Sequence, residues 1–271
     1  MNLSRELAAE HGRQAVGIAD SGEYHSSSGK KVGISGLVLR AIRETVSYSP
    51  DKTFPESAKG SHQTEVSVEN TTTLDAALRL IAPGYRPAVL NFASATDPGG
   101  GFLSGARAQE EYLARSSALY ACIRNNPMYA FHRSRRDPLY TDYAIYSPDV
   151  PVFRSDDGSL LDEPYTVAVI TCPAVNAKRV PPERKTEIGP AMWRRILRVL
   201  HIGINHSHDS IVLGAWGCGA FGNDSRQIAG LFRRALEENF KGSYRQVVFA
   251  ILDWSRDRRF IGPFEKALKA S

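Results

Sequence analysis

The chain has 271 residues, of which 42% are hydrophobic and 23% charged, and its formal net charge is +5. This composition is that of an ordinary globular protein, and it excludes low-complexity and fibrous chains. No apolar run approaches the length needed to span a bilayer, and the first ten residues lack the apolar core of a secretory signal. Three widely spaced cysteines support neither a disulfide framework nor a metal site, so we expect a reducing, cytoplasmic location.

The first sixty residues are predicted to form a helical extension. Helical spacing of apolar residues predicts helices over residues 3–18 and 36–46. Residues 50–60 are polar and broken, which is typical of a connection into another unit. We therefore expect an N-terminal helical extension over residues 1–60 and one main domain over residues 61–271.

From residue 64 onward the pattern changes to alternating strands and helices. Period-two and continuous apolar runs predict strands, and helical spacing predicts the intervening helices. The predicted order is strand 64–70, helix 73–80, strand 88–93, helix 109–124, strand 165–170, helix 190–203, strand 210–216, helix 224–240 and strand 246–253. Such alternation predicts an α/β fold with a largely parallel central sheet and helices on both of its faces.

Two glycine-rich loops each leave a predicted buried strand and enter a predicted helix. In the first, the run Gly99–Gly101 is followed, after seven residues, by Gln109–Glu111. Successive glycines cost backbone entropy, and their use is close approach to a ligand or a positive φ. Ligands of open α/β sheets bind beyond the carboxyl ends of the strands, so we expect a ligand contact here. Acidic residues also complement a helix dipole, which is the alternative explanation for the glutamates alone.

The second loop spans residues 211–223 and also joins a strand to a helix. Its backbone N–H groups and the positive helix end predict an anion site suited to a diphosphate. Gly217, Gly219 and Gly222 match the spacing of a dinucleotide-binding motif. We reject that interpretation because little chain remains to complete the unit, and Asp253 comes too late to bind a ribose.

The triple glycine with Gln109-Glu110-Glu111 resembles the motif of poly(ADP-ribose) glycohydrolases, and most closely that of their short bacterial-type branch. The stretches 89–94, 145–154 and 214–223 support the resemblance, in the expected order. It implies a macrodomain fold, with a mixed sheet between two helical layers and an ADP-ribose cleft at the strand ends. It also implies hydrolysis of ribose–ribose bonds with release of ADP-ribose, and hence reversal of ADP-ribosylation, for example in a DNA damage response.

The resemblance also assigns roles to residues. The second glutamate of the motif is the acid/base in this family, which maps onto Glu111, and the first, Glu110, holds the ribose hydroxyls. Phe260 is a candidate for stacking on the adenine, with a core role as the alternative. The implied substrate contacts are Asn91, Gly99, Gly100, Gly101, Gln109, Gly217, Cys218, Gly219, Ala220 and Phe221.

One departure from the animal enzymes is the sequence Asn91-Phe-Ala-Ser94, which stands where they have Asp–Phe–Ala–Asn. Ser94 therefore receives no role. The large accessory domains of the animal enzymes have no counterpart in this chain, which leaves internal cleavage and chain-length preference open.

The expected mechanism passes through an oxocarbenium-like state. Glu111 starts protonated, donates its proton to the leaving ribose oxygen and then acts as a base towards water. Its burial beside Glu110 and the substrate diphosphate favours the protonated form at the start. The folded-back diphosphate supplies the negative charge that a second carboxylate supplies in other glycosidases. The reaction needs no metal and no redox cofactor.

The expected partners are poly(ADP-ribose), ADP-ribose and poly(ADP-ribosyl)ated proteins, with no membrane and no sequence-specific nucleic acid. Two alternatives remain open. One is a reader that binds ADP-ribose without cutting it, against which the intact Gln109–Glu111 argues. The other is a hydrolase of single ADP-ribose units on proteins.

Overall fold

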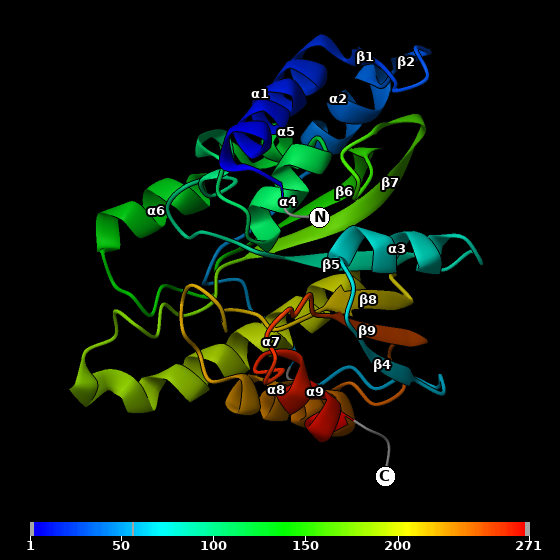
Figure 1. Cartoon of the computed structure of the whole chain (residues 1–271). Helices are drawn as coiled ribbons and strands as arrows, with labels where there is room; N and C mark the ends of the chain where they lie inside the picture. The colour runs from blue at the N-terminus through cyan, green and yellow to red at the C-terminus, as the bar shows by residue number, and fades with distance from the viewer. Residues whose placement is uncertain (1–2, 56, 269–271) are drawn as a thin grey trace.

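The computed structural model describes residues 3–55 and 57–268, and its centre is a seven-stranded mixed sheet with helices on both faces (Figure 1). Across the sheet the order is β3-β6-β7-β5-β8-β9-β4. Neighbours from β7 to β4 run parallel, whereas β3, β6 and β7 pair antiparallel. The predicted α/β fold with a mixed, largely parallel sheet is therefore confirmed. The strands are β3 (Val46–Tyr48), β4 (Glu65–Glu69), β5 (Pro87–Phe92), β6 (Ala144–Arg154), β7 (Leu160–Cys172), β8 (Ser210–Leu213) and β9 (Gln246–Ala250).

The helices form two layers and a cap (Figure 1). One layer packs on the first face of the sheet and consists of α3 (Thr73–Ile81), α4 (Gln109–Ser116), α5 (Leu119–Ile123) and α6 (Pro127–Arg135). The opposite layer consists of α7 (Ile188–Asn205), α8 (Ser225–Arg234) and α9 (Ile261–Leu268). The cap lies at the β6 end of the sheet and consists of α1 (Arg5–Ser21), α2 (Ser35–Arg43) and the hairpin β1 (Glu23–His25) and β2 (Lys31–Gly33).

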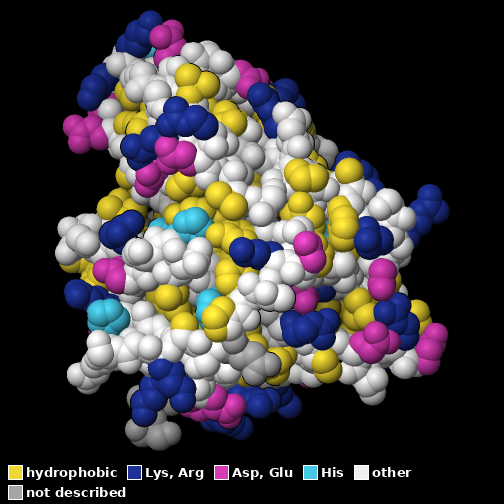
Figure 2. All heavy atoms as spheres, turned by 180° about the vertical axis from the view of Figure 1, so that it is seen from behind, with side chains coloured by type: hydrophobic (Ala, Val, Ile, Leu, Met, Phe, Trp, Pro, Cys, Tyr) yellow, Lys and Arg dark blue, Asp and Glu magenta, His cyan; other side chains and the backbone are white. Residues whose placement is uncertain are grey.

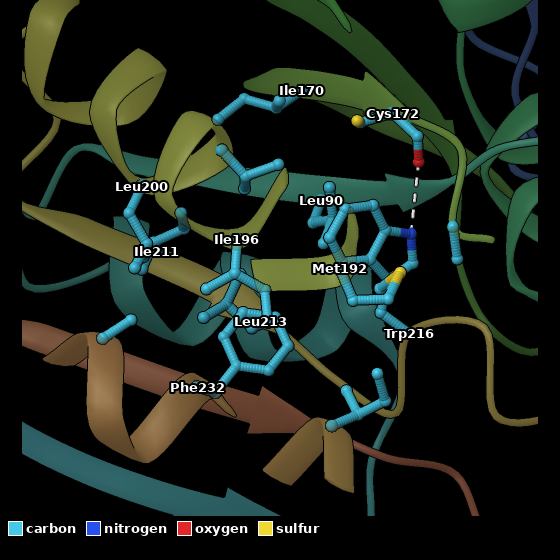
Figure 3. Packing of buried hydrophobic residues seen from close by; sticks show 14 of the residues in the cluster. Leu90, Ile170, Cys172, Met192, Ile196, Leu200, Ile211, Leu213, Trp216 and Phe232 are labelled. Atoms are coloured by element: carbon cyan, nitrogen blue, oxygen red, sulfur yellow. Dashed lines mark hydrogen bonds between the residues drawn. The ribbon is translucent and has the colours of Figure 1, made fainter. Parts of the chain in front are cut away.

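Strand β5 shows how the sequence builds a core on both faces. Successive side chains of a strand point to opposite faces. Ala88 and Leu90 belong to the cluster beneath α7 and α8, whereas Val89 belongs to the cluster beneath α3 and α4. Figure 3 shows the first cluster around Trp216, whose indole N–H donates to the Cys172 carbonyl at 3.2 Å. The continuous apolar run of β5 is thus a strand buried on both sides.

The predicted helix 109–124 is wrong in one respect, because it is broken in the middle. Ser117 adopts an extended conformation, with φ of −145°, and forms an isolated bridge with Val152 of β6. Its hydroxyl donates to the Leu113 carbonyl and accepts from the N–H of Leu119. A serine side chain that bonds to nearby backbone competes with the helix, and here it separates α4 from α5.

Other predicted boundaries also change. The helix predicted over 36–46 ends at Arg43, because Val46 already pairs with β6 as part of β3. The helix predicted over 224–240 finishes with a π-helical turn over Ala235–Asn239. The strands predicted over 210–216 and 246–253 end earlier, at Leu213 and Ala250. In both strands the residues that follow form loops beside a cavity.

Strand β6 carries no clear pattern in the sequence because Pro148 and Pro151 interrupt it. The structure accommodates Pro148 at an irregularity, where the register with β7 shifts between Ser147 and Val150, whereas Pro151 stays paired with Thr166. Proline is tolerated in strands at such bulges. Helix α6 was also missed, although Asn126 caps it and Pro127 stands at its first position.

The division of the chain at residue 60 stays a prediction. The N-terminal segment contributes β3 to the edge of the sheet, and α1 packs against α4. On the face seen in Figure 2, Lys and Arg side chains are interspersed with Asp and Glu. In the part of the chain that the structure describes, no helix is long and apolar enough to cross a membrane.

Candidate active site

A cavity of about 1170 Å³ opens at the carboxyl ends of the central strands. Strands β5, β7, β8 and β9 run in the same direction, so their ends meet at one edge of the sheet. Phe92, Ala174, Ala215 and Ala250 line the cavity at or just beyond these ends. This is the position at which open α/β sheets bind their ligands.

Helix α4 begins beside this cavity, and Gln109 attaches its first turn to the end of β5. The side-chain oxygen of Gln109 accepts from the N–H of Phe92 at 2.9 Å. Its amide nitrogen donates to the Leu90 carbonyl at 2.8 Å and to the Thr73 hydroxyl at 3.1 Å. Each polar atom of the side chain therefore has a protein partner. Gln109 positions the two glutamates that follow it.

Replacing Gln109 with leucine should destabilise the protein and lower its activity. Loss of these hydrogen bonds leaves the Phe92 N–H unpaired, which we expect to cost about 3 kcal/mol. Urea unfolding of Gln109→Leu measures this cost. Gln63→Leu is the matched control, because Gln63 is exposed, and such surface changes usually alter stability by about 0.5 kcal/mol or less. Equal stability of the two variants would contradict the positioning role.

Glu110 and Glu111 both turn back towards the first glycine loop. Glu110 accepts from the N–H of Ser94 at 2.6 Å, and Glu111 accepts from the N–H of Gly101 at 3.0 Å. The exposed fractions of the two residues are only 4% and 8%. Within the described residues, one oxygen of each carboxylate, Oε1 of Glu110 and Oε2 of Glu111, is buried without a hydrogen-bond partner. Buried polar atoms are rarely left unpaired, so these two oxygens mark a functional site.

The protonation of Glu110 follows from its surroundings. Burial raises the pKa of Glu110 well above its usual range, and the neighbouring Glu111 carboxylate raises it further. Hydrogen bonds from the N–H groups of Ser94 and Gly99 oppose the rise of this pKa. Burial and the nearby Glu111 carboxylate thus both disfavour the ionised form of Glu110.

The first glycine loop is shaped around these carboxylates. Gly99 and Gly100 have φ angles of +74° and +59°, which side chains rarely adopt. A Cβ atom added to Gly100 would lie 2.3 Å from Oε1 of Glu111 and 3.0 Å from Oε2 of Glu110. Only glycine leaves room for both carboxylates here.

The second glycine loop faces the same cavity. Gly217 has φ of +75°, and an added Cβ would lie 2.5 Å from that of Ala174. Among the residues that the structure describes, Gly219, Ala220 and Phe221 have backbone N–H groups that donate to no protein acceptor. Asp224 caps α8 by accepting from the N–H groups of Arg226 and Gln227. The free donors for an anion therefore belong to the loop and not to the helix end.

Asp253 organises the far end of the cavity. Its carboxylate accepts from the hydroxyl and N–H of Ser255, and from the N–H groups of Phe260 and Ile261. Burial alone would raise the pKa of Asp253, but these hydrogen bonds outweigh it and lower the pKa to about 2. This arrangement fixes Phe260, whose ring lines the cavity and lies 4.9 Å from the Arg259 guanidinium.

The carboxylate of Asp253 should stabilise the fold in a pH-dependent way. Its folded-state pKa is depressed, so the stabilisation is present above the unfolded value near 3.8 and is lost as pH falls towards 2. We expect Asp253→Asn to cost about 2 kcal/mol at pH 7, and this difference from the wild type to shrink as the pH falls from 3.8 towards 2. Urea unfolding across this range measures both effects. The exposed Asp257→Asn serves as the control, and a pH-independent difference would contradict the assignment.

The structure brings most of the predicted site residues together. Those that line the cavity are Gly100, Gly101, Gln109, Glu110, Glu111, Gly217, Gly219, Ala220, Phe221 and Phe260. Three lie behind them: Asn91 is fully buried with its amide 3.2 Å from the Thr171 hydroxyl, Gly99 shapes the loop, and Cys218 is buried. Direct substrate contact by these three stays a prediction.

Ser94 and several unpredicted residues also line the cavity. The Ser94 hydroxyl accepts from the N–H groups of Thr96 and Asp97, so it shapes the loop itself. Sequence reasoning assigned no site role to a further group of lining residues, most of which lie far apart in the sequence: Leu3, His11, Arg107, Tyr112, Arg115, Arg154, Asp156 and Trp254. In the described residues, no three His, Cys, Asp or Glu side chains are grouped so that they could hold a metal ion.

The sheet between two helical layers, with paired carboxylates and glycine loops at the strand ends, defines a macrodomain-like protein with a hydrolytic type of site. Comparisons with known proteins agree. The family model for the microbial-type PARG catalytic domain matches residues 12–155. No curated protein sequence matches the chain.

Three solved structures show how far the similarity extends. Poly(ADP-ribose) glycohydrolase (PARG) from Thermomonospora curvata has a TM-score of 0.92 and 43% identity, over 97% of this chain and 100% of that one. Its complex with the inhibitor ADP-HPD has a TM-score of 0.90 and 44% identity, over 96% and 99%. PARG from Deinococcus radiodurans, in complex with ADP-ribose, has a TM-score of 0.81 and 39% identity, over 88% and 99%. The chain belongs to the microbial-type PARG family.

Proposed function

We propose that the cavity hydrolyses the ribose–ribose bonds of poly(ADP-ribose), with Glu111 as the general acid and base. The observation that carries the proposal is the state of the Glu111 carboxylate. One oxygen is fixed by the N–H of Gly101, and the other is buried in the described structure without a partner. A general acid needs such a combination, because its orientation is set while its second oxygen is free for the reacting group. Glu110 has the same arrangement, and the choice of Glu111 rests on the family motif, whose second glutamate is the acid.

The chemistry proceeds in two proton transfers. Glu111 gives its proton to the leaving ribose oxygen as the glycosidic bond breaks and an oxocarbenium-like sugar forms. The carboxylate then removes a proton from the water that attacks the sugar carbon, which regenerates the acid and releases ADP-ribose. Glu110 holds the ribose hydroxyls.

The two glycine loops bind the rest of the ADP-ribose unit that carries the attacked sugar carbon and is released as product. The free N–H groups of Gly219, Ala220 and Phe221 suit the diphosphate, whose negative charge also stabilises the cationic sugar. Phe221 packs over the terminal ribose, and Phe260 stacks on the adenine at the far end of the cavity. The support for these roles is that Gly219, Ala220, Phe221 and Phe260 all line the same cavity as Glu110 and Glu111.

The polymer reaches the enzyme on poly(ADP-ribosyl)ated proteins, which we propose as its macromolecular partners. Their support is chemical, since the polymer is made on protein side chains. We also propose a cytoplasmic location, which the three widely spaced cysteines favour, and a part in a DNA damage response, which the family resemblance implies.

Incubation with purified poly(ADP-ribose) and chromatography of the products tests the reaction. Free ADP-ribose is the expected product. A parallel sample with a protein that carries single ADP-ribose units distinguishes the alternatives. Release from that protein with intact polymer would identify a hydrolase of single units. Tight ADP-ribose binding with no release in either sample would identify a reader.

A further inference from the structure

The cavity extends past the catalytic glutamates towards α1 and the loop that follows β6. Its volume of about 1170 Å³ exceeds the roughly 300–1,000 Å³ usual for one drug-sized ligand. His11 of α1, Arg115 of α4 and Arg154 at the end of β6 line this second arm. Arg115 lies one helical turn beyond Glu111 on the same face of α4.

Two arginines in this arm are buried, with exposed fractions of 8% for Arg115 and 4% for Arg154. Arg154 uses its donors within the protein, on the carbonyls of Arg115 and Gly158 and on the side-chain oxygen of Gln14. Arg115 makes only one such bond in the described part of the chain, from Nη1 to the Ala106 carbonyl at 3.3 Å. Its remaining donors have no protein acceptor.

The positive groups of the arm act on one another. Burial and, to a smaller extent, the charge of Arg115 lower the pKa of Arg154 to about 10. Burial, together with Arg154 and Arg115, lowers the pKa of His11. Burial also lowers the pKa of Arg115, although the Glu111 carboxylate opposes that fall. Like charges held together in a desolvated place are costly unless a ligand compensates them.

Two carboxylates also line this arm, but both already have partners. Asp156 accepts from the hydroxyls of Tyr112 and Thr72. Asp157 accepts from the hydroxyl of Ser155 and the N–H of Ser159. Neither forms a salt bridge with Arg115 or Arg154 within the described residues. The hydrogen-bond donors that remain free in this arm therefore belong to a positively charged side chain, that of Arg115.

We propose that Arg115, with Arg107, His11 and Arg154 around it, binds the diphosphate of the polymer unit that leaves when the bond is cut. This inference rests on the proposed function. The glycine loops hold the ADP-ribose on one side of Glu111, so the departing unit must extend from the other side. Its ribose supplies the oxygen that Glu111 protonates, and that same ribose carries a diphosphate on its 5′ carbon. The guanidinium fork of Arg115 matches a phosphate better than any neutral group in the arm.

The test compares two substrates that differ only in the leaving group. One is the dimer of ADP-ribose, and the other is 4-nitrophenyl ADP-ribose, whose leaving group has no phosphate. For Arg115→Gln we expect kcat/KM to fall roughly 10- to 100-fold on the dimer and to stay within about threefold on the aryl substrate. Arg107→Gln should give a smaller loss with the same selectivity. Arg107 is exposed, so this variant covers the case in which Arg115→Gln does not fold.

Arg13→Gln is the matched control, because Arg13 lies on α1, pairs with Glu10 and does not line the cavity. It should turn over both substrates normally. Equal losses on both substrates would overturn the subsite and make Arg115 a positioning residue for Glu111. Unchanged kinetics on the dimer in both Arg115→Gln and Arg107→Gln would overturn it as well. If the wild type cut neither substrate, the failure would lie with the proposed function.

Discussion

Glu111→Gln is expected to lose nearly all cleavage of poly(ADP-ribose) while it still binds ADP-ribose. The glutamine side chain can accept the same hydrogen bond from Gly101, so the loop keeps its shape. It cannot donate a proton to the leaving oxygen or take one from water, and general acid–base catalysis contributes roughly 10²- to 10⁴-fold. Turnover of purified polymer and calorimetric titration with ADP-ribose measure the two effects separately.

A poor and a good leaving group separate the two proposed roles of Glu111, as acid towards the leaving oxygen and as base towards water. The ribose oxygen needs a proton to depart, whereas 4-nitrophenolate departs without one. The defect of Glu111→Gln should therefore be smaller on 4-nitrophenyl ADP-ribose than on polymer. Turnover of polymer near the wild-type rate would show that another group is the acid.

Gly100→Ala should lower the activity by roughly 100-fold and lower the stability by about 1–2 kcal/mol. The new methyl group would stand 2.3 Å from Oε1 of Glu111, so the carboxylate must move away. Misplacement of a catalytic group by about 1 Å costs roughly 100-fold in rate. The positive φ of 59° adds a backbone strain of about 1–2 kcal/mol. Polymer turnover and urea unfolding measure the two quantities.

Gly230→Ala is the control for this substitution. Gly230 lies inside α8, and nothing lies within 4 Å of an added Cβ. Alanine there should leave turnover unchanged and raise stability by up to about 1 kcal/mol. Normal turnover in Gly100→Ala would mean that Glu111 does not react from the position seen in this structure.

The sequence predicted the central part of the fold because its strands are buried on both faces. Continuous apolar runs such as the one in β5 are unambiguous, and turn residues bound them. Strand β6 escaped prediction because two prolines interrupt it and its partner β3 is only three residues long. The break at Ser117 depends on a bridge to Val152, which is a tertiary contact that no local pattern of α4 can reveal.

Distance along the sequence decides which part of the site could be predicted. The part around the two glutamates could be predicted, whereas the second arm could not. Gly99–Gly101 and Gln109–Glu111 are close in sequence, so their spacing carries a motif. His11, Arg115 and Arg154 come from three distant elements, and each alone looks like an ordinary surface or core residue. Gln109 shows a subtler difference, since the motif implied a substrate contact while its side chain is fully used in holding α4.

Helix α4 has only eight residues, yet it is tied to the sheet at both ends, through Gln109 to β5 and through Ser117 to β6. An isolated helix of that length would have no stability in water. The glutamates therefore sit on a segment that owes its shape entirely to the sheet, and it cannot unwind without breaking these ties. The catalytic geometry should then persist until the whole domain unfolds, so this enzyme would lose its activity by melting and not by gradual loosening of its active site.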